Sequence, residues 1–321
     1  MKTFEYASPK SLKDAIGLLS DHWGETEVLA GGTDLLTSIK QDVTAPGRVV
    51  SLKEVDGLSG IDSKGGNLTI GATTKLKDLI ANGDVQKHFP GLVTAAKNIG
   101  SAQIINAGTV AGDLLQRPRC WYFRNGFGLF GLENGKELIP DGDNRYHAIF
   151  GNSGKAKFVN PSSLAPLLIA LGASIDVQGP KRDRSVKAAD FFSTPKSESE
   201  REYALRANEI VTGISIPLSG KKNGVYEVRH RRGLDWPMVA AAVAFDEGRR
   251  RVRNASVVLG HVAPTPWVAD RAAAALNGQS REAGAQAAGN AAAQGATPLS
   301  MNAYKVAQVK VAVRRAIEAA S

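Results

Sequence analysis

Cysteine is almost missing from this chain of 321 residues, which contains Cys120 alone, and histidine is scarce, with five residues. A single cysteine excludes an intramolecular disulfide, and it excludes a zinc or iron–sulfur site built from four cysteines of this chain. The histidines are scattered, without the regular spacing that metal ligands usually show. We therefore predict no metal site in this chain.

Long apolar runs are also missing. No segment approaches the roughly 20 apolar residues that a membrane helix needs, and the N-terminus MKTFEYASPK lacks the apolar stretch of a signal peptide. We expect no membrane insertion and a cytoplasmic location, or a periplasmic one if a partner subunit carries an export signal. With 43% hydrophobic and 22% charged residues, the chain can bury a large core and is long enough for about two or three domains.

Acidic residues are fewer than basic ones: the chain has 31 Asp and Glu and 40 Lys and Arg, which gives a formal net charge of +9. The basic runs RHRR (229–232) and GRRRVR (248–253) raise the possibility of a nucleic-acid partner. Neither run is interleaved with aromatic residues on a recognisable binding module. We therefore expect no nucleic acid, and we interpret the runs as solvated strand or turn edges, with a subunit interface or an anionic cofactor as the better-suited partner.

The first fifty residues predict a small α/β unit. Ser8 is expected to cap a helix whose first turn holds Pro9, because apolar residues recur at helical spacing after it. A strand over 28–30, a short helix opening at Thr33 and a strand over 48–52 complete the unit.

A second block, from about residue 57, mixes strands and helices around one long irregular segment. From Gly220 the pattern changes to antiparallel strands, with DEG (246–248) as the turn of a hairpin, and then to alanine-rich helices. We predict one unit over 1–219, with subdomains of about 1–55 and 56–219, and a C-terminal α+β domain over 220–321. A helix running into a strand is expected over 162–179. Further strands are expected over 67–72, 209–217, 225–232, 238–245 and 251–260, helices over 74–82, 90–100, 265–277, 281–294 and 302–320, and an irregular loop over 125–147.

The stretch VLAGGTDLL (28–36) places two adjacent glycines directly after a strand. Gly31 and Gly32 let the backbone approach a ligand and turn its N–H groups inward, which suits a pyrophosphate, and Thr33 adds a hydroxyl donor. Asp34 would repel a phosphate, so we expect it to organise the loop. Taken alone, a single Gly-Gly pair favours a simple turn from strand to helix over a phosphate loop.

The stretch NAGTVAGDLL (106–115) repeats this chemistry, with small residues at 107, 108, 111 and 112 and a hydroxyl at Thr109. Two such loops in one domain can hold a dinucleotide from both sides. Neither matches the G-x-G-x-x-G pattern that opens the helix of a Rossmann unit, so that fold is not predicted.

Four stretches together resemble a known family. AGGTDLL, AGTVAGDL, NPSSLAPLLIALGA (160–173) and VVLGHVAPTPWVA (257–269) resemble, in this order and at this spacing, the FAD-binding medium subunit of the molybdenum hydroxylases, the xanthine dehydrogenase and carbon monoxide dehydrogenase family. The resemblance covers essentially the whole chain. The bridging LLQRPRCWYFR (114–124) resembles the flavin subunit of bacterial periplasmic-type aldehyde oxidoreductases.

This resemblance implies an α+β fold: an FAD-binding domain of the vanillyl-alcohol-oxidase (PCMH) type in two subdomains, followed by the C-terminal domain typical of these flavoproteins. Two positions depart from the family pattern. Ser163 stands where the family often has an acidic residue, and Glu227 stands where a lysine near the flavin is frequent, with Arg229 as a possible substitute. The implied FAD-binding residues are Glu27, Val28, Leu29, Ala30, Gly31, Gly32, Thr33, Asp34, Leu35, Gly108, Thr109, Ala111, Gly112, Asp113, Ser163, Val211 and Glu227.

The resemblance further implies a subunit of a heterotrimer that relays electrons. In the family a large molybdopterin-binding subunit oxidises the organic substrate, a small subunit with [2Fe–2S] clusters carries electrons, and FAD passes them to the final acceptor. The chain offers no convincing acid/base pair or nucleophile, so no catalytic residue is predicted. The alternative is a self-sufficient FAD oxidoreductase on the same fold that acts on its own small substrate.

Cys120 has a special place in this resemblance. In the aldehyde oxidoreductase branch the corresponding cysteine is one of four that hold a [4Fe–4S] cluster, and here the other three are missing. One thiolate cannot hold such a cluster, so no [4Fe–4S] cluster is expected, and Cys120 is interpreted as a remnant of the ligand set or as a packed side chain. Apolar residues are expected to fill the space: Leu129, Phe130, Leu132 and Phe150.

Overall fold

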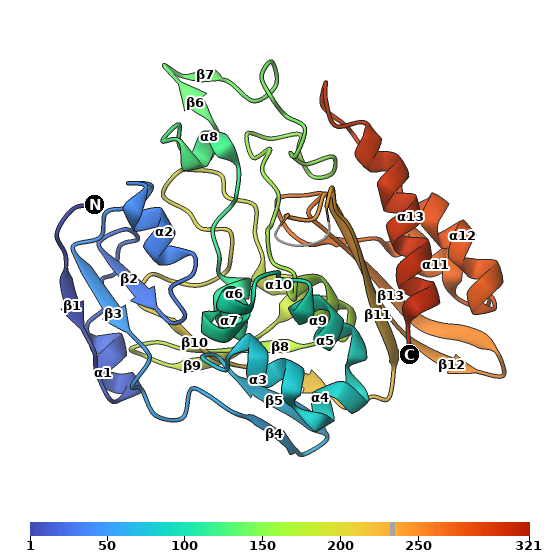
Figure 1. The fold of residues 1–321 in the computed structure, drawn as a ribbon, viewed down its shortest axis with the longest axis horizontal. Coiled ribbons are helices and arrows are strands. Elements are labelled where there is room, and N and C mark those ends of the chain that lie inside the picture. The colour runs from blue at the N-terminus through green and yellow to red at the C-terminus, as the bar shows by residue number, and fades with distance from the viewer. Residues whose placement is uncertain (232–234) are drawn as a thin grey trace.

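An N-terminal unit of three parallel strands and two short helices begins the chain (Figure 1). The computed structural model describes residues 1–231 and 235–321. The strands lie in the order β1-β3-β2, with the buried Val49 and Val50 in the central strand. The elements are β1 (Glu5–Ala7), α1 (Leu12–Gly17), β2 (Thr26–Leu29), α2 (Leu35–Lys40) and β3 (Arg48–Ser51).

The first helix begins three residues later than the sequence predicted. Ser11, and not Ser8, caps α1, because its Oγ accepts a hydrogen bond from the backbone N–H of Asp14 at 3.1 Å. Ser11 Oγ also contacts the Asp14 carboxylate at 2.6 Å, so residues 11 to 14 form their own cap and Pro9 stays outside the helix. The prediction for this cap was wrong.

A five-stranded antiparallel sheet, in the order β4-β5-β10-β8-β9, forms the second unit. Leu68, Ile70 and Ile214 are fully buried and pack with the helices that cover the sheet. Ile210 of β10 packs instead with Ala15 and belongs to the core beneath the N-terminal unit, so the two units share apolar contacts. The strands are β4 (Ile61–Lys64), β5 (Asn67–Gly71), β8 (Ser174–Gln178), β9 (Asp183–Lys187) and β10 (Ile210–Pro217), and the helices are α3 (Leu76–Ala81), α4 (Gly83–His88), α5 (Pro90–Lys97), α6 (Ala102–Ala107), α7 (Val110–Leu114), α8 (Trp121–Arg124), α9 (Ala165–Ala170) and α10 (Ala188–Phe191).

The C-terminal unit is an antiparallel sheet in the order β11-β12-β13-β14 with helices on one face. Strand β12 is buried on both faces. Val243 and Phe245 pack under the helices, whereas Ala242 and Ala244 join the core of the second unit. The alternation of side chains along one strand therefore joins the two cores. The elements are β11 (Lys222–Val228), β12 (Val239–Gly248), β13 (Arg251–Gly260), β14 (Trp267–Val268), α11 (Asp270–Leu276), α12 (Arg281–Ala292) and α13 (Tyr304–Ala319).

The β12–β13 hairpin turns at a different place from the predicted one. Gly248 pairs with Arg251, so Asp246–Gly248 belongs to the strand and the turn consists of Arg249 and Arg250. Both turn residues have positive φ, 51° and 61°, as a two-residue turn that matches the twist of the strands requires. The GRRRVR run is thus an exposed hairpin end. The strand predicted over 225–232 ends at Val228, and its last residue, Arg232, lies outside the described residues.

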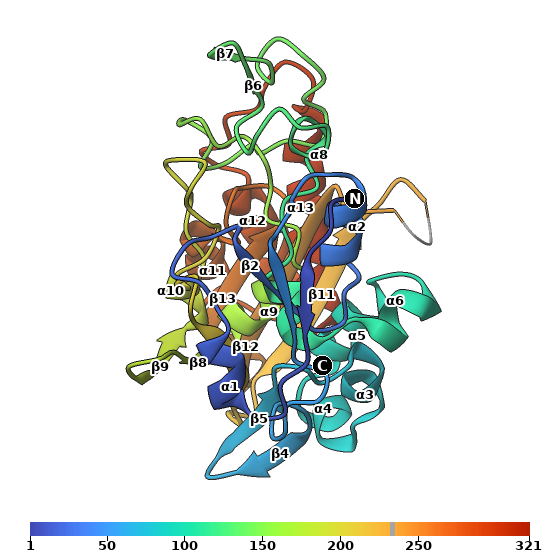
Figure 2. The ribbon, with the colours of Figure 1, turned by 90° about the vertical axis from the view of Figure 1, so that its left-hand side faces the viewer.

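The long segment after α8 is irregular, as predicted, apart from the short pair β6 (Leu132–Glu133) and β7 (Lys136–Glu137). It lies at one end of the molecule in both views (Figure 2). Leu129, Phe130 and Phe158 form a small apolar cluster against which Cys120 and Leu132 pack. Phe150 does not join this cluster. It stacks on Trp267 at 5.1 Å in the C-terminal core, because its backbone is hydrogen-bonded to Val262.

None of the helices in the part of the chain that the structure describes is both long and apolar enough to span a bilayer.

Candidate functional site

The first glycine loop follows β2 and leads into α2. Gly32 has a φ of 77°, a left-handed conformation that glycine adopts without strain. At Gly31 a Cβ would lie 2.3 Å from the carbonyl oxygen of Ala107 and 2.9 Å from the Cα of Gly108. The loop is therefore in direct backbone contact with the second loop, and only glycine fits at this crossing.

The second glycine loop runs from α6 into α7. Thr109 caps α7, since its Oγ1 accepts a hydrogen bond from the backbone N–H of Gly112 at 3.2 Å. A Cβ on Gly112 would lie 2.7 Å from this Oγ1, so glycine is required for the turn to close. The N–H of Leu76 donates to the carbonyl of Gly108, and the N–H of Val110 donates to that of Thr74, which fixes the loop to the start of α3.

Three cavities border the crossing of the loops. One, of about 730 Å³, is lined by Gly31, Ala107 and Thr109 together with Lys75 and Asp78. Of the other two, the larger, of about 450 Å³, opens between the N-terminal unit and the second unit, and the smaller, of about 170 Å³, faces the C-terminal unit. These two share Thr33, Asp34 and Thr109. Within the described residues, the backbone N–H groups of Gly31 and Gly32 have no protein acceptor, so they are available to an anionic ligand.

Most of the predicted site residues line one cavity or the other. Leu29 and Glu227 are the two that do not. Leu29 packs instead with Ile39 and Val49. The larger cavity is lined by Glu27, Val28, Ala30, Gly31, Gly32, Thr33, Asp34, Leu35, Thr109, Ala111, Gly112 and Val211, and the smaller by Thr33, Asp34, Gly108, Thr109, Gly112, Asp113 and Ser163.

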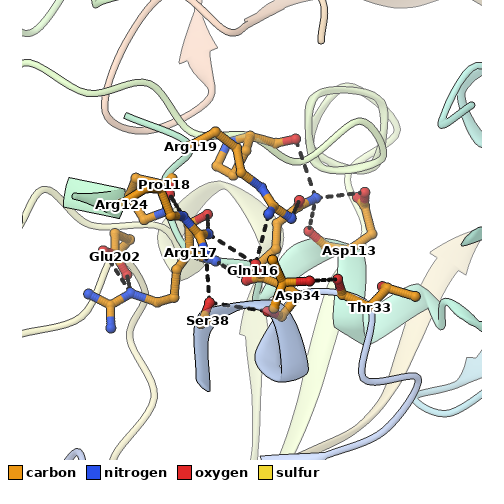
Figure 3. A network of polar contacts seen from close by, with 12 residues as sticks. Thr33, Asp34, Ser38, Asp113, Gln116, Arg117, Pro118, Arg119, Arg124 and Glu202 are labelled. Carbon is orange, nitrogen blue, oxygen red and sulfur yellow. Dashed lines mark hydrogen bonds and ion pairs between the residues drawn. The ribbon is translucent and has the colours of Figure 1, made fainter. Parts of the chain in front are cut away.

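Asp34 is the centre of an arginine network (Figure 3). Its carboxylate accepts a hydrogen bond from the backbone N–H of Arg117 at 2.8 Å and forms ion pairs with Arg119 at 2.9 Å and Arg124 at 3.0 Å. Arg124 also donates to Ser38 of α2 and to the carbonyl of Arg117. The segment after the second loop is thereby tied to the first loop, and Asp34 organises the loop as its charge suggested.

Arg119 is partly desolvated at this position, and burial lowers its pKa to about 10. Its guanidinium lies over the ring of Trp236, 4.7 Å from the centroid. Arg119 thus connects the first loop with the C-terminal unit.

Asp113 holds the second loop through hydrogen bonds from neutral groups. Its carboxylate accepts hydrogen bonds from the hydroxyl of Ser162, from the backbone N–H of Leu164 at 3.0 Å and from the side chain of Gln116 at 3.0 Å. Burial raises the pKa of Asp113, against these hydrogen bonds. The N–H of Ser163 also points to this carboxylate, at 3.4 Å, so Ser163 takes part in holding the loop.

Glu227 and Arg229 form a buried pair next to the smaller cavity. Arg229 Nε donates to Glu227 Oε2 at 2.9 Å, and its Nη2 donates to the carbonyl of Asn98. Arg229 lines the smaller cavity and Glu227 does not. Burial raises the pKa of Glu227, and the charge of Arg229 opposes this shift. The positive charge at the wall of the smaller cavity therefore comes from Arg229 and Arg119, and Glu227 adds none.

Sequence reasoning missed several residues of the larger cavity, among them Trp23, Arg117, Arg201 and Tyr203. The Tyr203 ring meets Trp23 edge-on at 6.0 Å and stacks on Phe191 at 6.1 Å. Arg117 had a signal, because it follows the second loop in the QRPR stretch. Trp23 and Tyr203 come from irregular segments without periodicity, so nothing in the sequence indicated them.

The residues of this site are suited to binding a ligand. No histidine or cysteine lines either of the two cavities. In the described ranges, 1–231 and 235–321, no three His, Cys, Asp or Glu side chains are grouped as a metal site requires. Free N–H groups at a crossing of two glycine loops, with a cavity on each side, suit an elongated ligand with a pyrophosphate at its middle. The fold and the site define a dinucleotide-binding protein of a non-Rossmann type.

Comparison with known proteins extends this definition. Residues 2–219 match the family described as the FAD binding domain in molybdopterin dehydrogenase, and residues 224–320 match the CO dehydrogenase flavoprotein C-terminal domain. The chain belongs to the family of FAD-binding medium subunits of the molybdenum hydroxylases, as its sequence motifs predicted.

Individual relatives are similar over nearly their whole length. The aldehyde oxidoreductase FAD-binding subunit PaoB of Escherichia coli is 30% identical over 97% of this chain and 96% of its own. The carbon monoxide dehydrogenase medium chain of Hydrogenophaga pseudoflava is 30% identical over 99% of this chain and 96% of its own. A solved structure of carbon monoxide dehydrogenase from the same organism superposes with a TM-score of 0.78, at 28% identity, over 99% of this chain and 97% of that one. The α+β fold with a small C-terminal antiparallel sheet is therefore that of the family.

Proposed function

We propose that this chain is the FAD-binding electron-transfer subunit of a multi-subunit molybdenum hydroxylase of the aldehyde or xanthine dehydrogenase kind. A molybdopterin-binding large subunit would oxidise the organic substrate, and a small subunit with [2Fe–2S] clusters would deliver the electrons to this chain, which passes them to an external acceptor. The observation that carries the proposal is the crossing of the two loops, where Gly31 lies against the carbonyl of Ala107 between two cavities.

FAD fits the residues at this crossing. The free N–H groups of Gly31 and Gly32 and the hydroxyl of Thr33 would hold the pyrophosphate. The two ends of the dinucleotide would occupy the two cavities. The larger has charged side chains, such as Glu27 and Arg201, beside aromatic ones such as Tyr203. The smaller has apolar walls, such as Ile99 and Ile104, with Ser163 among them. When bound, FAD accepts electrons singly and gives them up singly or in pairs.

The residues of this chain bind and orient the cofactor. The carboxylates closest to the loops are engaged: Asp34 by arginines and Asp113 by hydroxyl, amide and N–H donors. Neither is placed as a general base, which supports a relay in place of an enzyme with its own organic substrate. Because no His or Cys lines these cavities, FAD is expected to be bound without a covalent link to such a side chain.

The organisation of the chain and complex follows from the same proposal. Residues 1–219 would form the PCMH-type FAD-binding domain, with subdomains of about 1–55 and 56–219, and residues 220–321 the C-terminal domain. The partners would be one large and one small subunit, with no nucleic acid and no [4Fe–4S] cluster on this chain. The compartment is expected to be the cytoplasm, unless a partner carries the complex across the membrane.

Purification of the native complex tests the proposal. We expect copurification with a molybdopterin subunit and a [2Fe–2S] subunit, bleaching of FAD absorbance when the organic substrate is added to the complex, and release of all flavin into the supernatant on acid precipitation. Substrate turnover by the isolated chain would contradict the relay. Flavin that stays with the acid pellet would contradict the non-covalent site.

A further inference from the structure

The tip of the β12–β13 hairpin, residues 246–254, has no part in the proposed FAD site. None of these residues lines either FAD-site cavity. In Figure 1 the hairpin tip projects from the C-terminal unit at the lower right. It contains the basic run GRRRVR, to which neither the loop motifs nor the proposed function gives a role.

The hairpin tip exposes four arginines, Arg249, Arg250, Arg251 and Arg253. The side chain of Arg251 donates a hydrogen bond from Nη1 to the carbonyl of Gly278 at 2.6 Å. The other three side chains have no hydrogen-bond or ion-pair partner in the part of the chain that the structure describes. Three guanidinium groups are therefore available to a partner from outside the chain.

The acidic residues of the hairpin tip do not neutralise these arginines. The carboxylate of Asp246 accepts a hydrogen bond from the side-chain amide of Asn254 at 2.7 Å. Glu247 forms an ion pair with Arg281 of α12, also at 2.7 Å. Both carboxylates are thus engaged elsewhere, and the surface around the turn is positively charged.

The turn of the hairpin consists of residues that disfavour its backbone conformation. Arg249 and Arg250 have φ values of 51° and 61°, in the left-handed region. Two-residue turns of this kind usually contain Asn-Gly, because a residue with a long side chain adopts a positive φ only at a cost in conformational energy. No hydrogen bond or ion pair of the two side chains to the described residues compensates for this cost. Strain without local compensation is typical of segments with a function.

The base of the hairpin tip is fixed to the neighbouring helices. Val252 is fully buried; its N–H donates to the carbonyl of Gln279 at 2.9 Å, and its carbonyl accepts from the N–H of Gly278 at 2.8 Å. These bonds tie β13 to the segment between α11 and α12. Arg253 lies over Gly248, where an added Cβ would meet its guanidinium, so its charge is close to the turn. The arginines therefore extend from a fixed base, which reduces the order that binding must impose.

An acidic protein surface suits the hairpin tip better than a nucleic acid or a membrane. The planar guanidinium binds a carboxylate through two parallel hydrogen bonds and is weakly hydrated. The hairpin tip has no aromatic side chain that could stack on a base. Its one large apolar residue, Val252, is buried and cannot insert into lipid.

We propose that the hairpin tip docks on an acidic face of a partner subunit, where the guanidinium groups of Arg249, Arg250 and Arg253 pair with carboxylates. This assignment rests on the proposed function, which supplies the partner subunits. The contact gives the strained turn its role, since Asn-Gly at the same two positions would relieve the strain and remove two of the three free charges.

Replacement of the turn by its unstrained form tests the proposal. Arg249→Asn combined with Arg250→Gly removes both the strain and the two charges. We expect the melting temperature of the FAD-loaded full-length chain to rise by at least about 2 °C. The dissociation constant of the chain in the native complex, measured by sedimentation over a dilution series, should rise at least about tenfold. Unchanged affinity, or a melting temperature that does not rise, would overturn the proposal.

Two further double variants separate charge from turn shape. Arg249→Lys combined with Arg250→Lys keeps both charges and should keep the affinity within about threefold. Lys181→Asn combined with Arg182→Gly removes two exposed charges from the turn between β8 and β9 and should keep it within about twofold. A lysine variant as weak as the Asn-Gly variant, or an equal loss in the β8–β9 control, would overturn the proposal.

Other anionic partners are tested with the same samples. We expect the native chain to bind neither double-stranded DNA nor vesicles of phosphatidylserine and phosphatidylcholine at about 0.15 M salt. Binding of either one, lost in the Arg249→Asn/Arg250→Gly variant while assembly of the complex is unchanged, would assign the hairpin tip to that partner and overturn the proposal.

The composition of the native complex separates this proposal from the proposed function. A complex with FAD, molybdopterin and [2Fe–2S] subunits whose assembly does not respond to the variants would overturn the docking surface and leave the function standing. A native chain that purifies without any partner subunit would overturn both.

Discussion

The two glycine loops end alike in sequence and are held in different ways. Asp34 follows the first loop and Asp113 the second, and two leucines follow each aspartate. The side chain of Asp34 is 17% exposed, and its carboxylate lies among Arg117, Arg119 and Arg124. The carboxylate of Asp113 is buried among neutral donors. One loop is held mainly by ion pairs, the other by hydrogen bonds.

The difference arises from the segments that each loop meets, not from the loops themselves. Asp34 meets the arginine-rich segment 116–124, whereas Asp113 meets the start of the 160–173 segment. The same side chain therefore forms ion pairs with arginines in one place, whereas in the other it lies among neutral donors and burial raises its pKa. Replacement by asparagine, which preserves shape but not charge, should distinguish the two.

The largest effect on FAD binding is expected at Gly31, where one substitution disturbs both glycine loops. Gly31→Ala places a methyl group 2.3 Å from the carbonyl oxygen of Ala107, where backbone on both sides cannot yield. We expect FAD affinity to fall at least about 1,000-fold. Flavin absorbance per chain after desalting measures this loss.

Gly83→Ala is the matched control, because a Cβ there meets nothing within 4 Å. This control should keep its full flavin content. Stoichiometric FAD in Gly31→Ala would show that the crossing of the loops is not the cofactor site.

The next largest effect is expected at Asp113, which holds the second loop through hydrogen bonds from neutral donors. Asp113→Ala leaves the N–H of Leu164 and the hydroxyl of Ser162 without their acceptor and should lower the free energy of unfolding by about 3 kcal/mol. Asp113→Asn keeps one acceptor oxygen, and the Ser162 hydroxyl can turn to accept from the amide. We expect the asparagine variant to recover most of the loss in denaturant unfolding; a loss equal to that of alanine would mean that the charge is required.

The pH dependence of the same variant provides a second test. Burial raises the folded-state pKa of Asp113 above its ordinary 3.8. Between these two pKa values the folded chain binds more protons than the unfolded chain, so this residue's contribution to stability falls as the pH rises through that window. Asp113→Asn lacks this titration. The stability of the variant relative to the native chain should therefore rise with pH from about 4 upward, and parallel pH curves would contradict a raised pKa.

A smaller loss of stability is expected at Asp34, which holds the first loop through ion pairs. Here, unlike at Asp113, asparagine should not recover the loss. Asp34→Ala and Asp34→Asn should both lower the free energy of unfolding by about 2 kcal/mol, because each leaves Arg119 and Arg124 without their carboxylate. Both variants should also lose flavin on desalting, since the first loop is released. Full rescue by asparagine at position 34 would mean that the two loops are held alike.

The sequence was sufficient to single out the two glycine loops, because glycines after a strand have few physical alternatives, but it did not predict the backbone contact between Gly31 and Ala107. It also predicted the order of the main strands and helices, whose periodicity extends over many residues. Leu29 was included because motif matching took the whole stretch 27–35, and strand alternation would not have excluded it, since Leu29 shares its face of β2 with Glu27, which lines the larger cavity.

The rest depended on tertiary contacts. The hairpin turn at Arg249 and Arg250 is fixed by the register of β12 and β13, and the glycine at 248 suggested a wrong position. The cap of α1 was likewise decided by one hydrogen bond to Ser11. Tyr203 and Trp23 line the larger cavity from irregular segments, and no local sequence pattern predicts that they lie close together.

The smallest effect is expected at Cys120, which lies in the segment that holds the first loop. The arginines make the contacts to Asp34, whereas Cys120 packs at the edge of an apolar cluster and contacts only His147 among polar side chains in the described structure. Cys120→Ser keeps a donor toward His147 and should cost less than about 1 kcal/mol of unfolding free energy, with flavin content unchanged. Arg124→Met, which removes an ion pair and the bond to Ser38 from the same segment, is the comparison and should cost clearly more. Iron and sulfide analysis of the separately purified chain should find neither, because one cysteine cannot hold a [4Fe–4S] cluster. About four irons per FAD, lost in Cys120→Ser, would make this cysteine a cluster ligand and the segment a part of the electron path.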